Sequence, residues 1–490
     1  MRLSELLAEE SMDQRALRDL DITGLTADSR AVQPGFLFAA LPGAAVDGRA
    51  YIEDAVKHGA TAVLAPPGTD LGAGRMDARN TPVRLITDSN PRRRFAQMAS
   101  RFFGAQPETI AAVTGTNGKT SVAHFSRQIW ARLGHKAGYL GTLGAAAPGL
   151  DIPGSLTTPD PVKLHTMLAD MAAHGVTHLA MEASSHGLHQ FRVDGVKIGI
   201  AGFTNITRDH LDYHGSMAAY LAAKLRLFSD VLMQGGTAVL NADSSEIAAF
   251  DVAARQRDHR VLKYGKAGDS IKLVNSTIEG TSQVLDLNVL AKSYRVRLPL
   301  AGTFQVSNAL CALGFAIASG ADTAAAVAAL EHLEGVPGRM QRAGVTGTGA
   351  HIYVDYAHTP DALETVLNAL RPHATGTLAV VFGCGGDRDK GKRRIMGEIS
   401  SRLADAVYVT DDNPRSEVPA TIRAEIMQGC PTATEIGDRA DAIAYAIGKL
   451  SAGDVLLVAG KGHENGQIIG STVIPFNDVD VVRSVPGVRA

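Results

Sequence analysis

Residues 110–121 read Ile-Ala-Ala-Val-Thr-Gly-Thr-Asn-Gly-Lys-Thr-Ser, and this stretch decides the fold. An apolar run of the buried-strand type leads directly into a loop with glycines at positions 115 and 118. Amides of such a loop, together with the start of the following helix, attract phosphate oxygens. The stretch therefore predicts a nucleotide-phosphate loop between a strand and a helix.

Two side chains of this loop have the chemistry that a bound nucleoside triphosphate needs. Lys119 can neutralise the β and γ phosphates, and the Thr120 hydroxyl can bind Mg²⁺. A bare match could arise by chance in a chain with 51 glycines. The strand before the loop and the helix after it argue against chance.

The same strand-helix rhythm continues on the C-terminal side of the loop. Strand-like runs recur at 179–181, 198–203 and 237–240, with helical patterns between them. This alternation is typical of a doubly wound parallel sheet. Residues 271–300 alternate like antiparallel hairpins, and residues 307–334 are alanine-rich and helical in pattern.

Further α/β units flank this central one. On the N-terminal side, strands are expected at 36–41 and 62–65, with a helix over 51–59 between them. A linker, Gly335-Val336-Pro337-Gly338, precedes a second series of apolar runs. The runs of that series fall at 352–354, 378–382, 406–409 and 455–458.

A chain of 490 residues exceeds the roughly 250–300 residues that one hydrophobic core supports. The predicted fold class is α/β with three domains: a central doubly wound P-loop ATPase domain, an N-terminal α/β domain and a C-terminal Rossmann-like α/β domain. The expected boundaries are 1–107, 108–336 and 337–490.

Composition excludes several classes of protein. The net charge of −2 gives no electrostatic basis for wrapping nucleic acid or lying on an anionic membrane. The basic run 92–94 stands alone and is expected to form a solvated helix turn. Apolar runs are too short to span a bilayer, and residues 1–15 do not have the pattern of a signal peptide. Three scattered cysteines favour a reducing compartment, so a cytoplasmic location is expected.

Two polar segments follow strands at the edge where α/β sheets place their functional groups. Glu182 ends the run at 179–181, and its carboxylate can hold Mg²⁺ beside the phosphate loop. Residues 204–215 are dense in His and Asp, which suggests a second Mg²⁺ site with His210 as a ligand. By itself, Lys224 has the pattern of an ordinary helix lysine.

Five segments together resemble the Mur ligase family. They are TGTNGKTS at 114–121, MEASSHGL at 181–188, TNITRDHLDYHG at 204–215, DYAHTPDAL at 355–363 and GKGHE at 460–464. The resemblance extends over essentially the whole chain. It implies an N-terminal domain that binds a UDP-sugar, a central ATPase and a C-terminal domain that brings in an amino acid. ATP and Mg²⁺ are the implied cofactors, and a monomer is implied.

The resemblance also implies roles for individual residues. Ser29, Thr157, Thr158, Ser184, Gln190 and Arg192 would bind the UDP-sugar substrate. Gly115, Thr116, Asn117, Gly118, Lys119, Thr120 and Ser121 would bind the ATP phosphates, and Asn308, Arg339 and Asp355 its adenosine. The metal would be held by Thr120, Glu182, His210 and Lys224 as a carbamate. Lys119, His210, Lys224 and His358 would be catalytic.

The turn Asp412-Asn413-Pro414-Arg415 resembles the signature of family members that add meso-diaminopimelate rather than lysine. Diaminopimelate carries a second, distal carboxylate, and a guanidinium fork is the natural partner of a carboxylate. Arg415 would therefore bind this carboxylate, with Arg388 as a second clamp. Glu464 would accept hydrogen bonds from the distal ammonium near Gly460. The alternative reading of this stretch is a plain turn, and we expect both a turn and a site.

The implied reaction has two steps. A carboxylate of the UDP-muramoyl dipeptide attacks the γ-phosphate of ATP, and the amine of diaminopimelate then attacks the acyl phosphate. The linker at 335–338 is the expected hinge for closing the site against water. A folylpolyglutamate or cyanophycin-type ligase and a regulatory ATPase without ligase chemistry are the alternatives.

Overall fold

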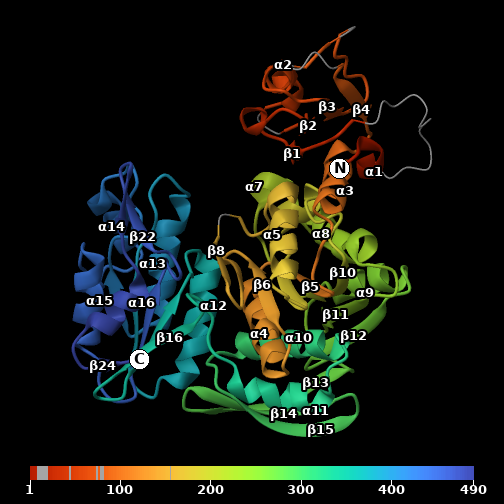
Figure 1. The fold of residues 1–490 in the computed structure, drawn as a ribbon. Coiled ribbons are helices and arrows are strands. Elements are labelled where there is room, and N and C mark those ends of the chain that lie inside the picture. The colour runs from red at the N-terminus through yellow and green to blue at the C-terminus, as the bar shows by residue number, and fades with distance from the viewer. Residues whose placement is uncertain (8–19, 44–45, 73–74, 78–81, 155) are drawn as a thin grey trace. The chain divides into compact units, whose positions relative to one another are not determined.

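The computed structural model describes residues 1–490 except 8–19, 44–45, 73–74, 78–81 and 155 (Figure 1). Residues 8–15 of the stretch inspected for a signal peptide therefore lie outside the described residues. Two compact units are present: Met1–Tyr264 with Gly314–Ala321, and Gly265–Leu313 with Asp322–Ala490. The domain boundaries expected from the sequence remain a prediction.

The first unit begins with a four-stranded parallel sheet in the order β1-β2-β3-β4. Its strands are β1 (Gly24–Thr26), β2 (Phe36–Ala39), β3 (Ala62–Ala65) and β4 (Arg84–Thr87). Its helices are α1 (Leu3–Leu7), α2 (Ile52–Lys57) and α3 (Pro91–Phe103). The predicted strands at 36–41 and 62–65 are confirmed within two residues.

Helix α3 starts where the sequence predicts a helix start. The Asn90 side chain accepts a hydrogen bond from Arg93 N at 3.1 Å, and proline occupies the first turn. The expectation of a fully solvated basic turn is wrong for Arg94. This side chain is buried and donates to Leu7 O at 3.1 Å, because α1 covers it. A backbone carbonyl at the end of α1 thus gains a donor.

The large sheet of the first unit has the order β12-β11-β10-β5-β9-β6-β7-β8. Strands β12 to β6 are parallel, and β7 and β8 form an antiparallel edge. The strands are β5 (Thr109–Thr114), β6 (Ala137–Gly141), β7 (Gly144–Ala147), β8 (Leu150–Pro153), β9 (His178–Glu182), β10 (Ile198–Phe203), β11 (Thr237–Asn241) and β12 (Arg260–Gly265).

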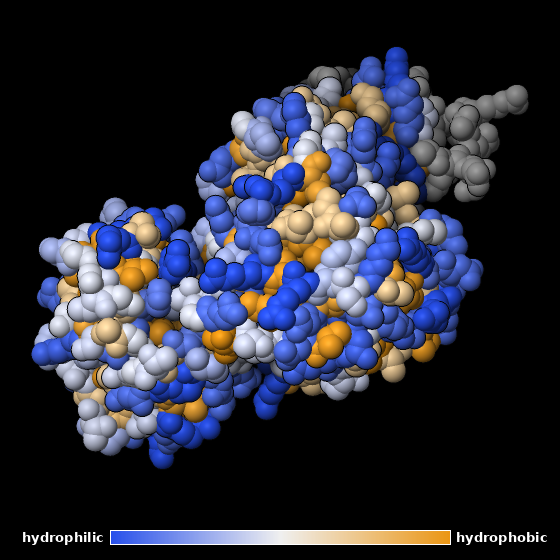
Figure 2. Space-filling view, turned by 90° about the horizontal axis from the view of Figure 1, so that it is seen from below, coloured by the Kyte–Doolittle hydropathy of each residue, from blue (hydrophilic) through white to orange (hydrophobic). Residues whose placement is uncertain are grey.

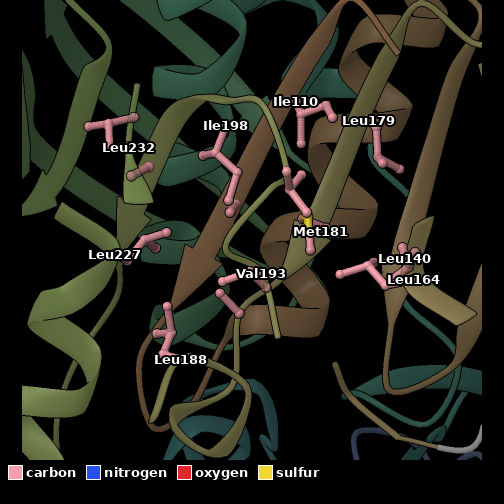
Figure 3. Packing of buried hydrophobic residues seen from close by; sticks show 14 of the residues in the cluster. Ile110, Leu140, Leu164, Leu179, Met181, Leu188, Val193, Ile198, Leu227 and Leu232 are labelled. Atoms are coloured by element: carbon pink, nitrogen blue, oxygen red, sulfur yellow. The ribbon is translucent and has the colours of Figure 1, made fainter. Parts of the chain in front are cut away.

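Helices cover this sheet and bury an aliphatic core. They are α4 (Lys119–Arg132), α5 (Pro161–Ala173), α6 (Ser185–His189), α7 (Leu211–His214), α8 (Met217–Arg226) and α9 (Ile247–Arg255). Figure 3 shows Ile110 of β5, Leu179 and Met181 of β9 and Ile198 of β10 among the residues of this core. Because β9, β5 and β10 are neighbours, the loops after their carboxyl ends meet at one edge.

The second unit contains the antiparallel strands β13 (Ile271–Glu279), β14 (Ser282–Val289) and β15 (Lys292–Leu298), as predicted for 271–300. The helical region after them is not continuous. Helix α10 (Thr303–Ala318) ends before Gly320, whose φ of +93° favours glycine, and α11 (Thr323–Ala329) begins anew.

A second sheet follows in the order β20-β19-β18-β21-β17-β16-β24. The four strands predicted for this region, β19, β18, β21 and β17, are neighbours and mutually parallel. The strands are β16 (Gln341–Thr346), β17 (His351–Asp355), β18 (Leu378–Phe382), β19 (Ala406–Val409), β20 (Thr434–Glu435), β21 (Val455–Ala459) and β24 (Val488–Arg489), with a separate hairpin of β22 (Gly466–Ile469) and β23 (Thr472–Pro475). The helices are α12 (Pro360–Leu370), α13 (Gly391–Leu403), α14 (Pro419–Met427), α15 (Arg439–Ile447) and α16 (Asp478–Ser484).

The expected linker at 335–338 packs within the second unit. Tyr356 N donates to Gly338 O at 2.9 Å, and a Cβ added at Gly338 would lie 2.2 Å from His463 N. Its suggested role as a hinge therefore gains no support from a loose local structure.

The face drawn in Figure 2 carries hydrophobic residues dispersed in small groups among hydrophilic ones. Within the described ranges, none of the helices combines the length and apolar character that crossing a membrane requires.

Candidate active site

The phosphate loop lies between β5 and α4, as the sequence predicts. A Cβ added at Gly115 would lie 1.9 Å from Thr204 Oγ1, so the close approach of the β10 loop requires glycine here. Gly118 caps the N-terminus of α4 with a φ of +88°. The first hydrogen bond of α4 runs from Val122 N to Gly118 O. The earlier amides of α4 are therefore not used within the helix and point outward from its start.

The loop amides are not all presented to a ligand. Thr116 N donates to Asn205 O at 2.9 Å, and Asn117 N donates to Asn205 Oδ1 at 3.0 Å. Asn205 thus holds the middle of the loop, and phosphate contacts are left to the amides around the start of α4. The Lys119 ammonium donates to Gly115 O at 3.0 Å and to Thr116 O at 2.8 Å.

Lys224 of α8 is buried against the same loop. Its Nζ donates to Gly115 O at 2.7 Å and lies 4.5 Å from the centre of the Tyr220 ring. Burial, and then the nearby charge of Lys119, hold the pKa of Lys224 well below its ordinary value. The Tyr220 hydroxyl is 3.1 Å from Thr116 Oγ1. The neutral amine is therefore favoured at a position that the sequence pattern marks only as a helix lysine.

Glu182, at the end of β9, is buried beside the loop. Its Oε1 accepts from Thr120 Oγ1 at 3.0 Å and from Thr142 N at 2.8 Å, and its Oε2 accepts from Thr142 Oγ1 at 3.2 Å. A hydroxyl and a carboxylate are the hard oxygen donors that Mg²⁺ accepts, usually alongside phosphate oxygens and water. The pair Thr120 and Glu182 therefore fits the predicted metal.

His210 stands apart from that pair. It adopts a φ of +52° at the start of α7, its side chain is partly exposed, and its ring lies 4.8 Å from that of His186. Within the described residues, no group of three or more His, Cys, Asp or Glu side chains is arranged to hold a metal ion. Any metal here would thus depend on hydroxyl, lysine-derived and substrate oxygens.

The candidate UDP-sugar residues of the first unit form one hydrogen-bonded network. Thr158 Oγ1 donates to Glu182 O at 3.0 Å and accepts from Ser184 N at 3.0 Å. Arg192 Nη1 donates to Thr158 O at 2.7 Å, while its Nη2 donates to Gln190 Oε1 at 2.7 Å. This network joins the substrate candidates directly to the strand end that carries Glu182.

Thr157 and Ser29 complete the candidate set differently. Thr157 Oγ1 lies 2.9 Å from Thr142 Oγ1, so it joins the network through the residue that also binds Glu182. Ser29 is buried at the start of a short 3-10 helix, Ser29–Ala31. Among the described residues no hydrogen bond links Ser29 to the network.

In the second unit, the candidate adenosine residues surround the 339–341 segment. Asn308 Nδ2 donates to Gln305 Oε1 at 3.0 Å, and Gln305 Nε2 donates to Arg339 O at 3.3 Å. Asp355 accepts from Met340 N at 2.6 Å. The Arg339 guanidinium lies 4.7 Å from the centre of the Tyr356 ring. Three residues that are distant in sequence are thus brought to one segment.

His358 is fixed in the same region. Its Nδ1 lies 2.8 Å from Tyr356 O, and Lys392 Nζ donates to His358 O at 2.7 Å. Burial is the main cause that lowers the pKa of His358 below its ordinary value, so the ring is neutral at pH 7.

The stretch 412–415 forms a turn in which Pro414 O accepts from Glu417 N at 3.0 Å. Asn413 Nδ2 donates to Glu464 Oε2 at 2.9 Å. A Cβ added at Gly460 would lie 2.8 Å from Asp412 Oδ2, so this approach also requires glycine. The candidate residues from the turn and from the GKGHE segment therefore form one cluster.

Arg415 lies at this cluster and has a φ of +52°. Its Nη1 donates to Gly386 O at 2.8 Å, which fixes the guanidinium against the loop after β18. Arg388 lies on that loop but is exposed, and its Nη1 is 3.5 Å from Asp387 O. One arginine is thus held in place and the other remains extended.

Several functional side chains were not predicted. Lys461 is fully buried and donates to Asn413 Oδ1 at 3.0 Å and to Glu464 Oε2 at 2.8 Å. It lies within GKGHE, so the motif was the available signal. Thr142 carried no signal, because its role depends on β6 lying beside β9.

Comparison with known proteins bears on this arrangement. Three family models match successive segments: "Mur ligase family, catalytic domain" at 21–103, "Mur ligase middle domain" at 113–316, and "Mur ligase, glutamate ligase domain" at 338–462. The UDP-N-acetylmuramoyl-L-alanyl-D-glutamate–2,6-diaminopimelate ligase of Rhizobium meliloti (strain 1021) is 55% identical, over 96% of this chain and 95% of its own. The chain belongs to the Mur ligase family.

Solved structures agree with this Mur ligase assignment. A structure of a UDP-N-acetylmuramoyl-L-alanyl-D-glutamate–2,6-diaminopimelate ligase has a TM-score of 0.74 and 34% identity, covering 99% of this chain and 98% of that chain. A MurF ligase from Thermotoga maritima, solved with ADP, has a TM-score of 0.59 at 19% identity and covers 96% and 98% of the two chains, which shows the fold alone. The three-domain α/β fold class predicted from the sequence is confirmed.

Proposed function

We propose that this Mur ligase adds meso-2,6-diaminopimelate to UDP-N-acetylmuramoyl-L-alanyl-D-glutamate, with ATP as the energy source, during synthesis of the peptidoglycan precursor. The observation that carries the proposal is 55% identity, over nearly the full length of both chains, to a ligase of that name. The turn with Asn413 and Arg415 supports the choice of amino acid, because it joins a carboxylate-binding fork to an ammonium-binding Glu464.

The UDP-sugar substrate is assigned to the network of Thr157, Thr158, Ser184, Gln190 and Arg192, with Ser29 from the N-terminal sheet. Hydroxyl, amide and guanidinium groups suit a ligand that carries diphosphate and sugar oxygens. Because Thr158 Oγ1 also binds Glu182 O, a substrate bound to this network is positioned relative to the phosphate loop.

ATP phosphates are assigned to the loop from Gly115 to Ser121, and the adenosine to Asn308, Arg339 and Asp355. Bound Mg²⁺, held by Thr120 and Glu182 with His210 and Lys224 as further candidates, supplies positive charge to the phosphate oxygens. The Lys119 ammonium and the amides at the start of α4 stabilise the charge on the phosphoryl group as it passes to the substrate carboxylate.

Lys224 fits the role of a lysine that becomes a carbamate. Its pKa is lowered, so its amine is neutral more often than that of a surface lysine and can attack CO₂. The product exchanges a cation beside Lys119 for an anion, which removes the repulsion between two ammonium groups on Gly115 O.

In the second step the amine of diaminopimelate attacks the acyl phosphate, an amide forms and phosphate leaves. The distal carboxylate is assigned to Arg415, with Arg388 as a second donor, and the distal ammonium to Glu464. Asp412, Asn413, Pro414 and Gly460 shape this site, and a neutral His358 is assigned to the catalytic set. The proposal also includes a cytoplasmic location and a monomer, which light scattering can check.

The test is phosphate release with ATP, Mg²⁺ and the UDP-muramoyl dipeptide, with either meso-diaminopimelate or L-lysine added. Turnover that requires diaminopimelate supports the proposal. Turnover with L-lysine alone would keep ligase chemistry but reject the amino acid. Failure with both, together with turnover on a folate substrate, would reject the Mur reaction.

A further inference from the structure

The two loops that carry the candidate arginines are joined by a buried ion pair to which the proposed reaction assigns no role. We call them the clamp loops: residues 385–388 after β18 and residues 412–417 after β19. Arg393 of α13 lies beneath them with a fully buried side chain. It donates to Glu417 Oε1 at 2.9 Å through Nη2, to Glu417 Oε2 at 3.0 Å through Nη1, and to Gly385 O at 3.3 Å.

Glu417 transmits this anchor to both clamp loops. Its Oε1 also accepts from Asp387 N at 2.7 Å, so one carboxylate bonds to the first loop while it belongs to the second. The hydrogen bond from Arg393 is the largest cause that lowers the pKa of Glu417 to about 2. The carboxylate therefore stays ionised at every pH where the enzyme would work.

The clamp loops also interlock through their backbones. Gly386 N donates to Asn413 O at 2.9 Å, and Ser416 Oγ donates to Asp387 Oδ1 at 2.6 Å. A Cβ added at Gly386 would lie 1.9 Å from Pro414 O, so no other residue allows this approach.

Both loops contain a strained residue. Asp387 has a φ of +54° and Arg415 a φ of +52°, in a region that L-residues other than glycine rarely adopt. Such conformations persist only where surrounding contacts fix them. Arg415 donates from this conformation to Gly386 O in the opposite loop, so the position of its fork depends on the two loops staying in register.

We infer that Arg393 and Glu417 are positioning residues for the amino-acid substrate, holding the clamp loops so that Arg415 and Arg388 face a distal carboxylate. The inference rests on the proposed function. A buried ion pair is weak evidence for stability, because well-packed apolar residues often replace it without loss. Here the pair joins two loops that would otherwise meet only at their surfaces, and a misplacement of about 1 Å can cost about 100-fold in rate.

The chain offers a matched control. Arg393 Nη1 also donates to Glu425 Oε2 at 2.8 Å, and Glu425 makes no hydrogen bond to either clamp loop among the described residues. The substitutions Glu417→Gln and Glu425→Gln each remove one carboxylate charge from the same buried guanidinium. Only Glu417→Gln alters the anchor of the loops.

The experiment measures KM for diaminopimelate, ATP and the UDP-muramoyl dipeptide in wild type and both variants, with thermal midpoints and the ratio of kcat/KM for diaminopimelate to that for L-lysine. We expect Glu417→Gln to raise KM for diaminopimelate by about 10- to 100-fold and to lower the ratio similarly. The other two KM values should stay within about twofold, and Glu425→Gln should resemble wild type.

Equal effects of the two variants on every substrate, in step with lower thermal midpoints, would overturn the inference in favour of a structural role. An unchanged KM for diaminopimelate in a folded Glu417→Gln variant would also overturn it. Wild-type enzyme without diaminopimelate-dependent turnover would reject the proposed function itself, and this inference with it.

Discussion

Replacing Arg415 by alanine removes the fork assigned to the distal carboxylate. In the described residues this guanidinium donates through Nη1, to Gly386 O at 2.8 Å and to Asn413 O at 3.5 Å, which leaves its remaining N–H groups for a substrate. Two hydrogen bonds between charged groups contribute about 1.5–3 kcal/mol each, and water recovers part of that when the arginine is absent. A net loss of about 3 kcal/mol corresponds to about 150-fold in kcat/KM for diaminopimelate.

The assay is diaminopimelate-dependent phosphate release, with thermal unfolding measured in parallel. Arg402→Ala is the control, because Arg402 is an exposed arginine of the same unit, paired with Glu364. Activity with L-lysine, which has no distal carboxylate, should fall far less than activity with diaminopimelate. An equal loss with both amino acids, or a loss below about threefold, would refute the assignment of Arg415.

Three further predictions follow from buried charges. Glu182→Gln keeps the shape of the side chain but removes a carboxylate charge next to Thr120, so the Mg²⁺ concentration for half-maximal activity should rise at least about tenfold; an unchanged Mg²⁺ dependence would contradict the metal assignment. Burial lowers the pKa of His165 to about 4, so the folded chain binds fewer protons than the unfolded chain between about pH 4 and 6.5 and loses up to about 3 kcal/mol as pH falls through that range. His165→Leu should reduce this loss, and urea midpoints at pH 7 and pH 5 that shift equally in both proteins would refute it. Asp478→Asn leaves the fully buried Arg439 without its partner carboxylate and should lower the free energy of unfolding by about 3–5 kcal/mol, while a double Arg439→Met, Asp478→Leu variant should recover much of it in urea unfolding.

The parts of the fold that the sequence predicts are those encoded locally. Runs such as 378–382 and 455–458 are apolar on both faces, as expected for strands covered on both sides, and both are observed. The phosphate loop was predictable because its glycines, lysine and threonine are adjacent. The split between α10 and α11 was missed because an alanine-rich pattern hides one glycine at 320.

The parts that the sequence does not predict depend on the order of strands and helices in space. Thr142 reaches Glu182 because β6 pairs with β9, although 40 residues separate the two side chains. Arg94 is buried because α1 lies over it, and no pattern within 92–94 indicates that. Lys224 lies against Gly115 across 109 residues. Its identity as a site residue therefore came from family resemblance, not from its own surroundings.

The two lysines on the Gly115 carbonyl have a consequence for turnover. Lys119 already satisfies Gly115 O and Thr116 O, and Lys224 binds the first of these as well. Nucleotide binding at this loop is thus an exchange, in which the Lys119 ammonium gives up internal carbonyl partners to gain phosphate oxygens. An exchange yields less net affinity than the same contacts added to an unpaired ammonium, since the lost partners are subtracted. The loop takes back its own lysine when the product leaves, and this return lowers the barrier to releasing ADP.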